Sequence, residues 1–155
     1  MSTVVIGIGN RWRRDDGAGP AVLDRLERYR PPEGARLVEL DGEPARLVDA
    51  WTGAAVAIVV DAIRCDPPCP GRVRRIEVDG DTELGDDAPA VGGSHALGVA
   101  SAAALGRALG RMPARLVVFG IEGADFGPGE TISPPVAAAV DAVAARVAAE
   151  IEVAR

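Results

Sequence analysis

Asp16, Asp61 and His95 stand out chemically, because each lies at a junction between predicted elements of secondary structure. One imidazole nitrogen and two carboxylate groups are borderline-to-hard ligands. They suit nickel, zinc, manganese or iron, with positions left open for water or substrate. Two carboxylates without a metal also support aspartic-protease chemistry, in which they share one proton. The residues alone leave both chemistries open.

Residues 4–20 predict a buried strand, a glycine-rich turn and the start of a helix. The apolar run at 4–8 is typical of a strand covered on both faces. A dinucleotide-binding turn requires G-x-G-x-x-G, but Trp12 stands where the third glycine belongs. Asp15 and Asp16 would also repel a pyrophosphate at the helix start. A carboxylate at this end of a parallel strand is better suited to a cation.

Two later segments are expected to bring the other candidate residues to the same place. Residues 54–60 predict a central strand ending at Asp61, and a helix beginning near Ser94 precedes a strand at 115–120. If that strand is parallel to the first, the helix must start at the carboxyl edge of the sheet. His95 then lies beside Asp16 and Asp61. The alternatives are that Asp61 caps a turn or pairs with an arginine, and that His95 is a capping or core residue.

The remaining pattern completes an α/β chain. Residues 36–40 predict a second strand, residues 73–78 an antiparallel edge strand, and residues 79–91 a solvated loop. Ser133 is expected to cap the last helix. Glu122 and Asp125 are expected to be solvated loop residues, with substrate binding as the alternative. The valines of the last helix predict a core stripe.

Composition excludes several classes of protein. A chain of 155 residues with 48% hydrophobic residues has the size and composition of a single globular domain. Its net charge of −6 and aromatic content of 3% argue against nucleic-acid binding. No apolar run is long enough to span a membrane, and no leader is recognisable, so we expect a cytoplasmic protein. We expect a monomer, because no apolar surface stripe is left once the core is assigned.

The residue inventory narrows the chemistry further. The chain contains no lysine, which excludes a Schiff base, a Walker lysine and a Ser-Lys pair. His95 is the single histidine. Cys65 and Cys69 have no second pair to complete a zinc site, and we interpret them as part of a proline-rich surface loop.

Five segments follow one another in a fixed order along the chain. They are Gly7-Ile8-Gly9-Asn10, Asp15-Asp16-Gly17-Ala18-Gly19, Val60-Asp61-Ala62, Ser94-His95-Ala96-Leu97-Gly98 and the stretch from Gly120 to Ser133-Pro134. Together they resemble the hydrogenase maturation proteases, the endopeptidases that process the large subunit of [NiFe] hydrogenases. The resemblance covers nearly the whole chain.

The resemblance implies a single α/β domain over residues 1–155, with a mostly parallel, twisted five-stranded sheet between helices. It implies removal of a C-terminal extension from the large-subunit precursor after nickel insertion. Asp16, Asp61 and His95 correspond to the family's metal-binding residues, so they are the expected catalytic and metal-recognition residues. The nickel, supplied by the precursor, would be a checkpoint and a Lewis acid that polarises the scissile carbonyl or activates water.

One segment departs from the family pattern. Many members carry D-G-G-T-x-G after the second strand, whereas this chain has Asp41-Gly42-Glu43-Pro44-Ala45-Arg46. We expect Glu43 and Pro44 to stiffen and charge that loop, which affects the hydrogenase class served.

Two other functions stay open: a non-catalytic metal-dependent checkpoint or chaperone, and a small-molecule-binding domain. Alanine at each candidate residue is expected to leave the fold intact, on the assumption that the edge is exposed.

Overall fold

The computed structural model describes residues 2–29, 32–79 and 94–155, without the side chains of Tyr29, Asp79 and residues 94–97. In chain order, the elements are β1 (Thr3–Ile8), the 3₁₀ turn η1 (Arg14–Gly17), α1 (Ala18–Tyr29), β2 (Ala35–Leu40), α2 (Pro44–Trp51), β3 (Val56–Ile63), β4 (Val73–Asp79), α3 (Ser94–Leu109), β5 (Arg115–Glu122) and α4 (Pro134–Ala154).

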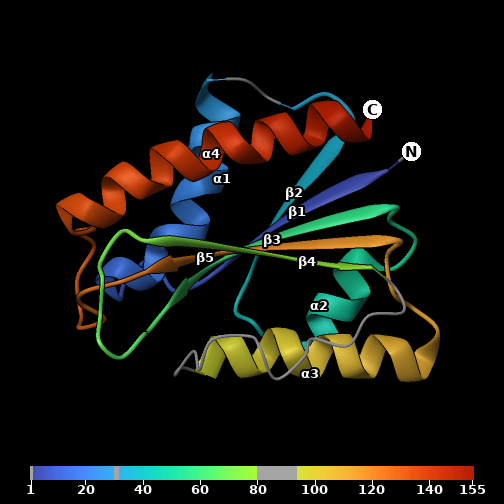
Figure 1. The fold of residues 1–155 in the computed structure, drawn as a ribbon, viewed down its shortest axis with the longest axis horizontal. Helices are drawn as coiled ribbons and strands as arrows, with labels where there is room; N and C mark the ends of the chain where they lie inside the picture. Colours follow the sequence, from blue (N-terminus) through green and yellow to red (C-terminus); the bar gives the residue numbers. More distant parts are fainter. Residues whose placement is uncertain (1, 30–31, 80–93) are drawn as a thin grey trace.

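The five strands form one sheet in the order β2-β1-β3-β5-β4. The first four of these are parallel to one another, and β4 is antiparallel to β5 at the edge. Figure 1 shows α1 and α4 on one side of the sheet and α2 and α3 on the other. The predicted three-layer α/β fold and its antiparallel edge strand are therefore confirmed.

Two apolar cores fill the spaces between the layers, because alternate residues of each strand point to opposite faces. The face toward α1 and α4 receives Val5, Ile58, Val60 and Phe119 from the strands. The face toward α2 and α3 receives Val4, Ile6, Ile8, Ala57 and Val59. The predicted valine stripe of α4 is confirmed, since its members Val136, Val140, Val143, Val147 and Ile151 are all buried.

Glycine allows α1 to begin directly against the sheet. A Cβ atom at Gly19 would lie 2.4 Å from the carbonyl oxygen of Ile8 and 2.6 Å from that of Val60. Any other residue would push the helix away from β1 and β3. The β1–α1 connection is thereby held at the edge where parallel α/β sheets bind their ligands.

The segment that departs from the family pattern builds a helix cap. The Glu43 carboxylate accepts hydrogen bonds from the backbone N–H groups of Ala45 and Arg46, at 3.0 and 2.9 Å, and Pro44 begins α2. Asp41 accepts a hydrogen bond from Glu43 N and pairs with Arg46 at 2.6 Å. These contacts confirm a charged loop, and its stiffness stays a prediction.

No helix within the described ranges combines the length and the apolar character needed to cross a membrane. The solvated loop predicted at 79–91 lies, apart from the backbone of Asp79, outside the described residues.

Candidate active site at the carboxyl edge of the sheet

Asp61 lies in a row of paired residues at the carboxyl edge. Leu40, Ile8, Asp61 and Gly120 are register partners across β2, β1, β3 and β5. Asp61 therefore aligns with the last residues of β1 and β2, while β3 itself continues to Ile63. The sequence placed Asp61 just after the strand, but the strand extends past it because β3 and β5 keep pairing after β1 has ended.

The Asp61 side chain belongs to the face covered by α2 and α3, because it alternates in phase with Ala57 and Val59. It is 2% exposed. Its neighbour in the row, Gly120, has no side chain, and a Cβ there would meet Ile63 at 2.9 Å. Glu122 alternates in phase with Leu116, and Arg74 is the register partner of Gly120, so this side of the edge carries a second carboxylate and an arginine.

Asp16 approaches the same edge from η1. Its Oδ2 atom accepts a hydrogen bond from the backbone N–H of Asn10 at 2.9 Å, and the residue is 3% exposed. The turn requires glycine at position 9, where φ is 150° and a Cβ would lie 1.9 Å from the Asp16 carbonyl oxygen. Gly9 also donates its N–H to Leu40 O at 3.1 Å, which ties the turn to the end of β2.

His95 is the second residue of α3, and its helix begins at this edge as predicted. A Cβ at Gly98 would lie 2.4 Å from the carbonyl oxygen of Gly42, which is in the loop that leaves β2. The first turn of α3 therefore packs on that loop. The His95 side chain lies outside the described residues, so the three-residue ligand set stays a prediction. Among the described side chains, no three acidic, cysteine or histidine groups form a metal cluster.

Asp16 and Asp61 are buried, which corrects the expectation that they sit on an exposed edge. An alanine at either position would leave space in a packed region and remove a buried polar partner, and both changes cost stability. Asparagine keeps the shape of the side chain, so it tests the role of the negative charge alone.

Asp15, the residue beside Asp16, is fully buried and holds two loops together. Its carboxylate accepts four hydrogen bonds from the β5–α4 loop: from Ala124 N at 2.8 Å, Asp125 N at 3.0 Å, Ser133 N at 2.8 Å and Ser133 Oγ at 2.9 Å. Burial alone would raise the pKa of Asp15, but these hydrogen bonds outweigh it and leave the pKa below its ordinary value.

Backbone hydrogen bonds extend this contact, which we call the clasp: residues 10–15 against residues 123–133. Arg14 N donates to Gly129 O at 2.8 Å, Gly129 N donates to Trp12 O at 2.8 Å, and Asp15 N donates to Asp125 O at 2.9 Å. Sequence patterns could not predict the clasp, because its partners lie more than a hundred residues apart.

Ser133 has a different role from the predicted one. It occupies the N-cap position of α4, but its side chain makes no capping hydrogen bond. The hydroxyl donates to Asp15 Oδ2 instead. Pro134 begins the helix as expected.

Glu122 is fully buried, so the expectation of a solvated loop residue is wrong. Its carboxylate accepts hydrogen bonds from Arg72 Nε and, at 3.3 Å, from the backbone N–H of Cys69, and Arg74 Nε lies 3.6 Å away. The hydrogen bond from Arg72 is the largest influence that holds the pKa of Glu122 below its ordinary value. Glu122 thereby fixes the loop at 64–72 against β5.

Cys65 and Cys69 are unbridged in this loop. Burial, followed by the hydrogen bond to Glu122, raises the pKa of the Cys65 thiol. A raised pKa disfavours the thiolate, the reactive form of cysteine. The unbridged cysteines agree with the prediction of a surface loop in which the thiols have no chemical role.

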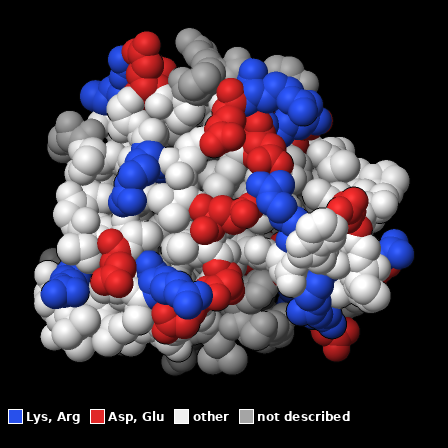
Figure 2. Space-filling model, turned by 180° about the vertical axis from the view of Figure 1, so that it is seen from behind, with Lys and Arg blue, Asp and Glu red and all other residues white. Residues whose placement is uncertain are grey.

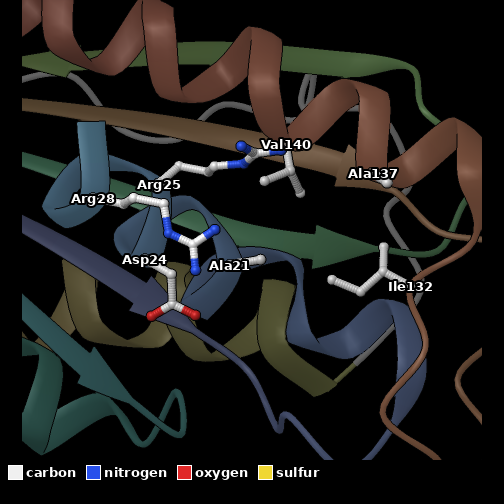
Figure 3. Close-up of a pocket in the computed structure, with 7 residues that line it drawn as sticks. All are labelled: Ala21, Asp24, Arg25, Arg28, Ile132, Ala137 and Val140. Atoms are coloured by element: carbon white, nitrogen blue, oxygen red, sulfur yellow. The ribbon is translucent and has the colours of Figure 1, made fainter. Parts of the chain in front are cut away.

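A pocket of about 290 Å³ lies between α1 and α4, lined by Ala21, Asp24, Arg25, Arg28, Ile132, Ala137 and Val140. Figure 3 shows the Arg28 guanidinium pointing toward Asp24. Arg25 pairs with Asp141 at 2.5 Å. The pocket is on the opposite side of the sheet from Asp61, and neither Asp16 nor Asp61 lines it, so it is separate from the candidate site.

Basic and acidic side chains alternate over the face shown in Figure 2. Many of the described arginines pair with carboxylates, wherever they lie on the surface: Arg75 pairs with Glu150 at 2.5 Å and Arg115 with Glu77 at 2.7 Å. On that face, the described residues form no continuous basic surface of the kind that binds nucleic acid.

Comparison with known proteins agrees with this geometry. Residues 20–150 match the HycI family model, which describes hydrogenase maturation proteases. A comparison with curated proteins gave no significant match.

Solved structures share the fold. The Escherichia coli hydrogenase-maturating endopeptidase HybD superposes with a TM-score of 0.81 at 20% identity, over 99% of this chain and 94% of its own. The [NiFe] hydrogenase maturation protease HybD from Thermococcus kodakarensis gives 0.72 at 24% identity, over 97% and 99%. The E. coli endopeptidase HycI gives 0.72 at 21% identity, over 96% and 90%.

Proposed function

Because the chain belongs to the hydrogenase maturation protease family and is therefore a peptidase, we propose that it removes the C-terminal extension of a nickel-loaded [NiFe] hydrogenase large-subunit precursor. The observation that carries this proposal is the position of Asp61. It is a buried carboxylate in the edge row, on the side covered by the helix that begins with Ser94 and His95. Asp16 reaches the same edge from η1.

The donor set suits recognition of nickel held by the precursor. Two carboxylates and an imidazole bind nickel readily and leave coordination positions for the precursor's own ligands. In this proposal the nickel belongs to the substrate, and Asp16, Asp61 and His95 test for its presence. An ion at that place supplies Lewis acidity to the scissile carbonyl or to the attacking water.

The carboxylates also have a role in the hydrolysis. Water adds to the scissile carbonyl carbon, the C–N bond breaks, and the departing amine takes up a proton. A buried carboxylate is suited to accept the proton of the attacking water and to return one to the amine. The burial of Asp16 and Asp61 supports this role, because charge interactions are stronger away from bulk solvent. The protein would act as a cytoplasmic monomer, and light scattering during gel filtration tests the oligomeric state.

The experiment is a mass-spectrometric processing assay with the large-subunit precursor from the same source, prepared with and without nickel. Loss of a C-terminal peptide from the loaded precursor alone is the expected result. Cleavage of both forms would favour the two-carboxylate mechanism without a metal checkpoint. Binding without cleavage would support the non-catalytic checkpoint instead. Neither binding nor cleavage of a loaded precursor would overturn the proposal.

A further inference from the structure

Trp12 is one of two tryptophans, and the two differ sharply in their surroundings. Trp51, the last residue of α2, is fully buried in the core, whereas Trp12 is 66% exposed. The other large apolar residues exposed in the described part of the chain are Leu109 and Val153, near the C-terminal ends of α3 and α4. Because both helices run away from the carboxyl edge, Trp12 alone of these three lies on the rim of the candidate site.

The backbone of Trp12 is fixed on both sides. Its N–H donates to Asn10 Oδ1 at 2.9 Å, and its carbonyl accepts from Gly129 N at 2.8 Å. The next two residues extend the attachment, since Arg13 Nε donates to Phe126 O at 3.3 Å and Arg14 Nε donates to Pro128 O at 3.1 Å. The clasp therefore presents the indole ring from a rigid support.

A rigid, exposed tryptophan has the properties of an interface anchor. Tryptophan is among the residues that contribute most when buried at the centre of an interface, and a preorganised backbone lowers the ordering cost of binding. The neighbouring arginines form ion pairs within the protein. Arg11 pairs with Asp24 and Glu39, each at 2.7 Å, and Arg14 lies 3.5 Å from Asp125. Among the described residues of this rim, the Trp12 ring is the large apolar group that remains exposed.

We propose that Trp12 is a docking anchor for the large-subunit precursor, its ring covered by an apolar surface next to the C-terminal extension. We infer the occupant from the position of Trp12. Asn10 donates to Asp16 Oδ2 and accepts from Trp12 N, so the loop holds Trp12 close to Asp16, and a polypeptide that brings its tail to the edge row meets this rim. The inference rests on the proposed function. It assigns Trp12 to substrate binding and not to the chemical step.

The first test is steady-state processing of nickel-loaded precursor by Trp12→Ala, Trp12→Phe and the matched control Leu109→Ala. We expect Trp12→Ala to raise KM about 10-fold or more with kcat unchanged. Trp12→Phe should recover most of the affinity, and Leu109→Ala should stay within about 2-fold of the parent chain, since its side chain is on the far edge. Unchanged KM in Trp12→Ala would overturn the inference.

The second test observes the ring directly. The protease is labelled with 5-fluorotryptophan, the two ¹⁹F resonances are assigned with Trp12→Phe, and unlabelled nickel-loaded precursor is added. The inference requires a shift of the Trp12 resonance while that of Trp51 stays in place. An unmoved Trp12 resonance during normal cleavage rejects the anchor but leaves the proposed function intact. A Trp12 resonance that shifts with protease concentration alone assigns the ring to a second copy of this chain and also rejects it.

Discussion

The β1–α1 loop and the loop at 64–72 leave the same edge of the sheet, and each is held by one fully buried carboxylate. In the first loop, Asp15 is satisfied by three backbone N–H groups and one hydroxyl, all from the β5–α4 loop. In the second, Glu122 is satisfied chiefly by Arg72, whose side chain is 48% exposed. One anchor uses neutral donors fixed in the backbone, and the other uses a cation on a flexible stem.

This difference indicates which of the two loops must be held in a precise position. Backbone donors cannot rotate toward water when their acceptor is lost, so the Asp15 clasp either forms completely or leaves buried N–H groups unpaired. An arginine that loses its partner can return to solvent. Asp15, whose donors are mostly backbone groups, lies beside Asp16 and Trp12. Glu122, whose main donor is a flexible arginine, lies beside the cysteines. We therefore expect the β1–α1 loop to orient the substrate and the loop at 64–72 to serve mainly the fold.

The largest effect on processing is expected for substitutions at the three candidate site residues. Asp16→Asn and Asp61→Asn should each reduce processing by roughly 100-fold or more, because the lost charge is at the candidate site. His95→Ala should do the same. Mass-spectrometric release of the C-terminal peptide measures the rate, and thermal unfolding shows whether the fold persists. Full activity in a folded variant would remove that residue from the site.

Asp15→Asn should have the largest effect on stability. The amide cannot accept all four hydrogen bonds, and its NH₂ group faces other donors, so unfolding should become easier by about 2–4 kcal/mol. Urea denaturation at pH 7 measures this. A loss below about 0.5 kcal/mol would show that the clasp is not a stabilising contact.

The same variant tests the pH dependence of the clasp. The pKa of Asp15 is lower in the folded state than in the unfolded state, so on acidification the unfolded chain binds the proton first. The stability that Asp15 adds is complete above its unfolded pKa of about 4 and disappears as pH falls through the folded value. The difference between the parent chain and Asp15→Asn should be constant from pH 7 to 5 and shrink below about pH 4. A difference that grows on acidification would contradict this assignment.

Glu122→Gln should be milder, at about 1–2 kcal/mol, because Arg72 can turn toward solvent while the amide keeps one acceptor. Urea denaturation beside Asp15→Asn makes the comparison direct. If Glu122→Gln proves the more damaging of the two, our ranking of the anchors is reversed.

The smallest effect is expected for Cys65→Ser combined with Cys69→Ser. Serine keeps a donor toward Glu122, so processing should stay within about 2-fold of the parent rate. The peptide-release assay decides this. A folded but inactive double variant would give the cysteines a function that their raised thiol pKa does not suggest.

The sequence predicted the layers, the edge strand and the α4 core stripe, because these depend on hydrophobic spacing along one segment. It also predicted that Asp16, Asp61 and the start of α3 share an edge, because parallel topology places them there. It missed the roles of Asp15, Glu122 and Ser133. Their partners come from distant loops, and nothing in local spacing distinguishes a buried carboxylate that holds a loop from a solvated one.

The contact between Gly98 and Gly42 imposes a constraint on how this protein can vary. Gly42 has a φ of 92°, which favours glycine, and its carbonyl oxygen lies where a side chain at position 98 would begin. Position 98 can accept a larger residue only if the β2–α2 loop gives way, and a residue other than glycine at 42 would strain that loop. We therefore expect the two positions to covary across homologues, and mutant libraries that randomise α3 to recover variants at 98 only together with a rebuilt β2–α2 loop.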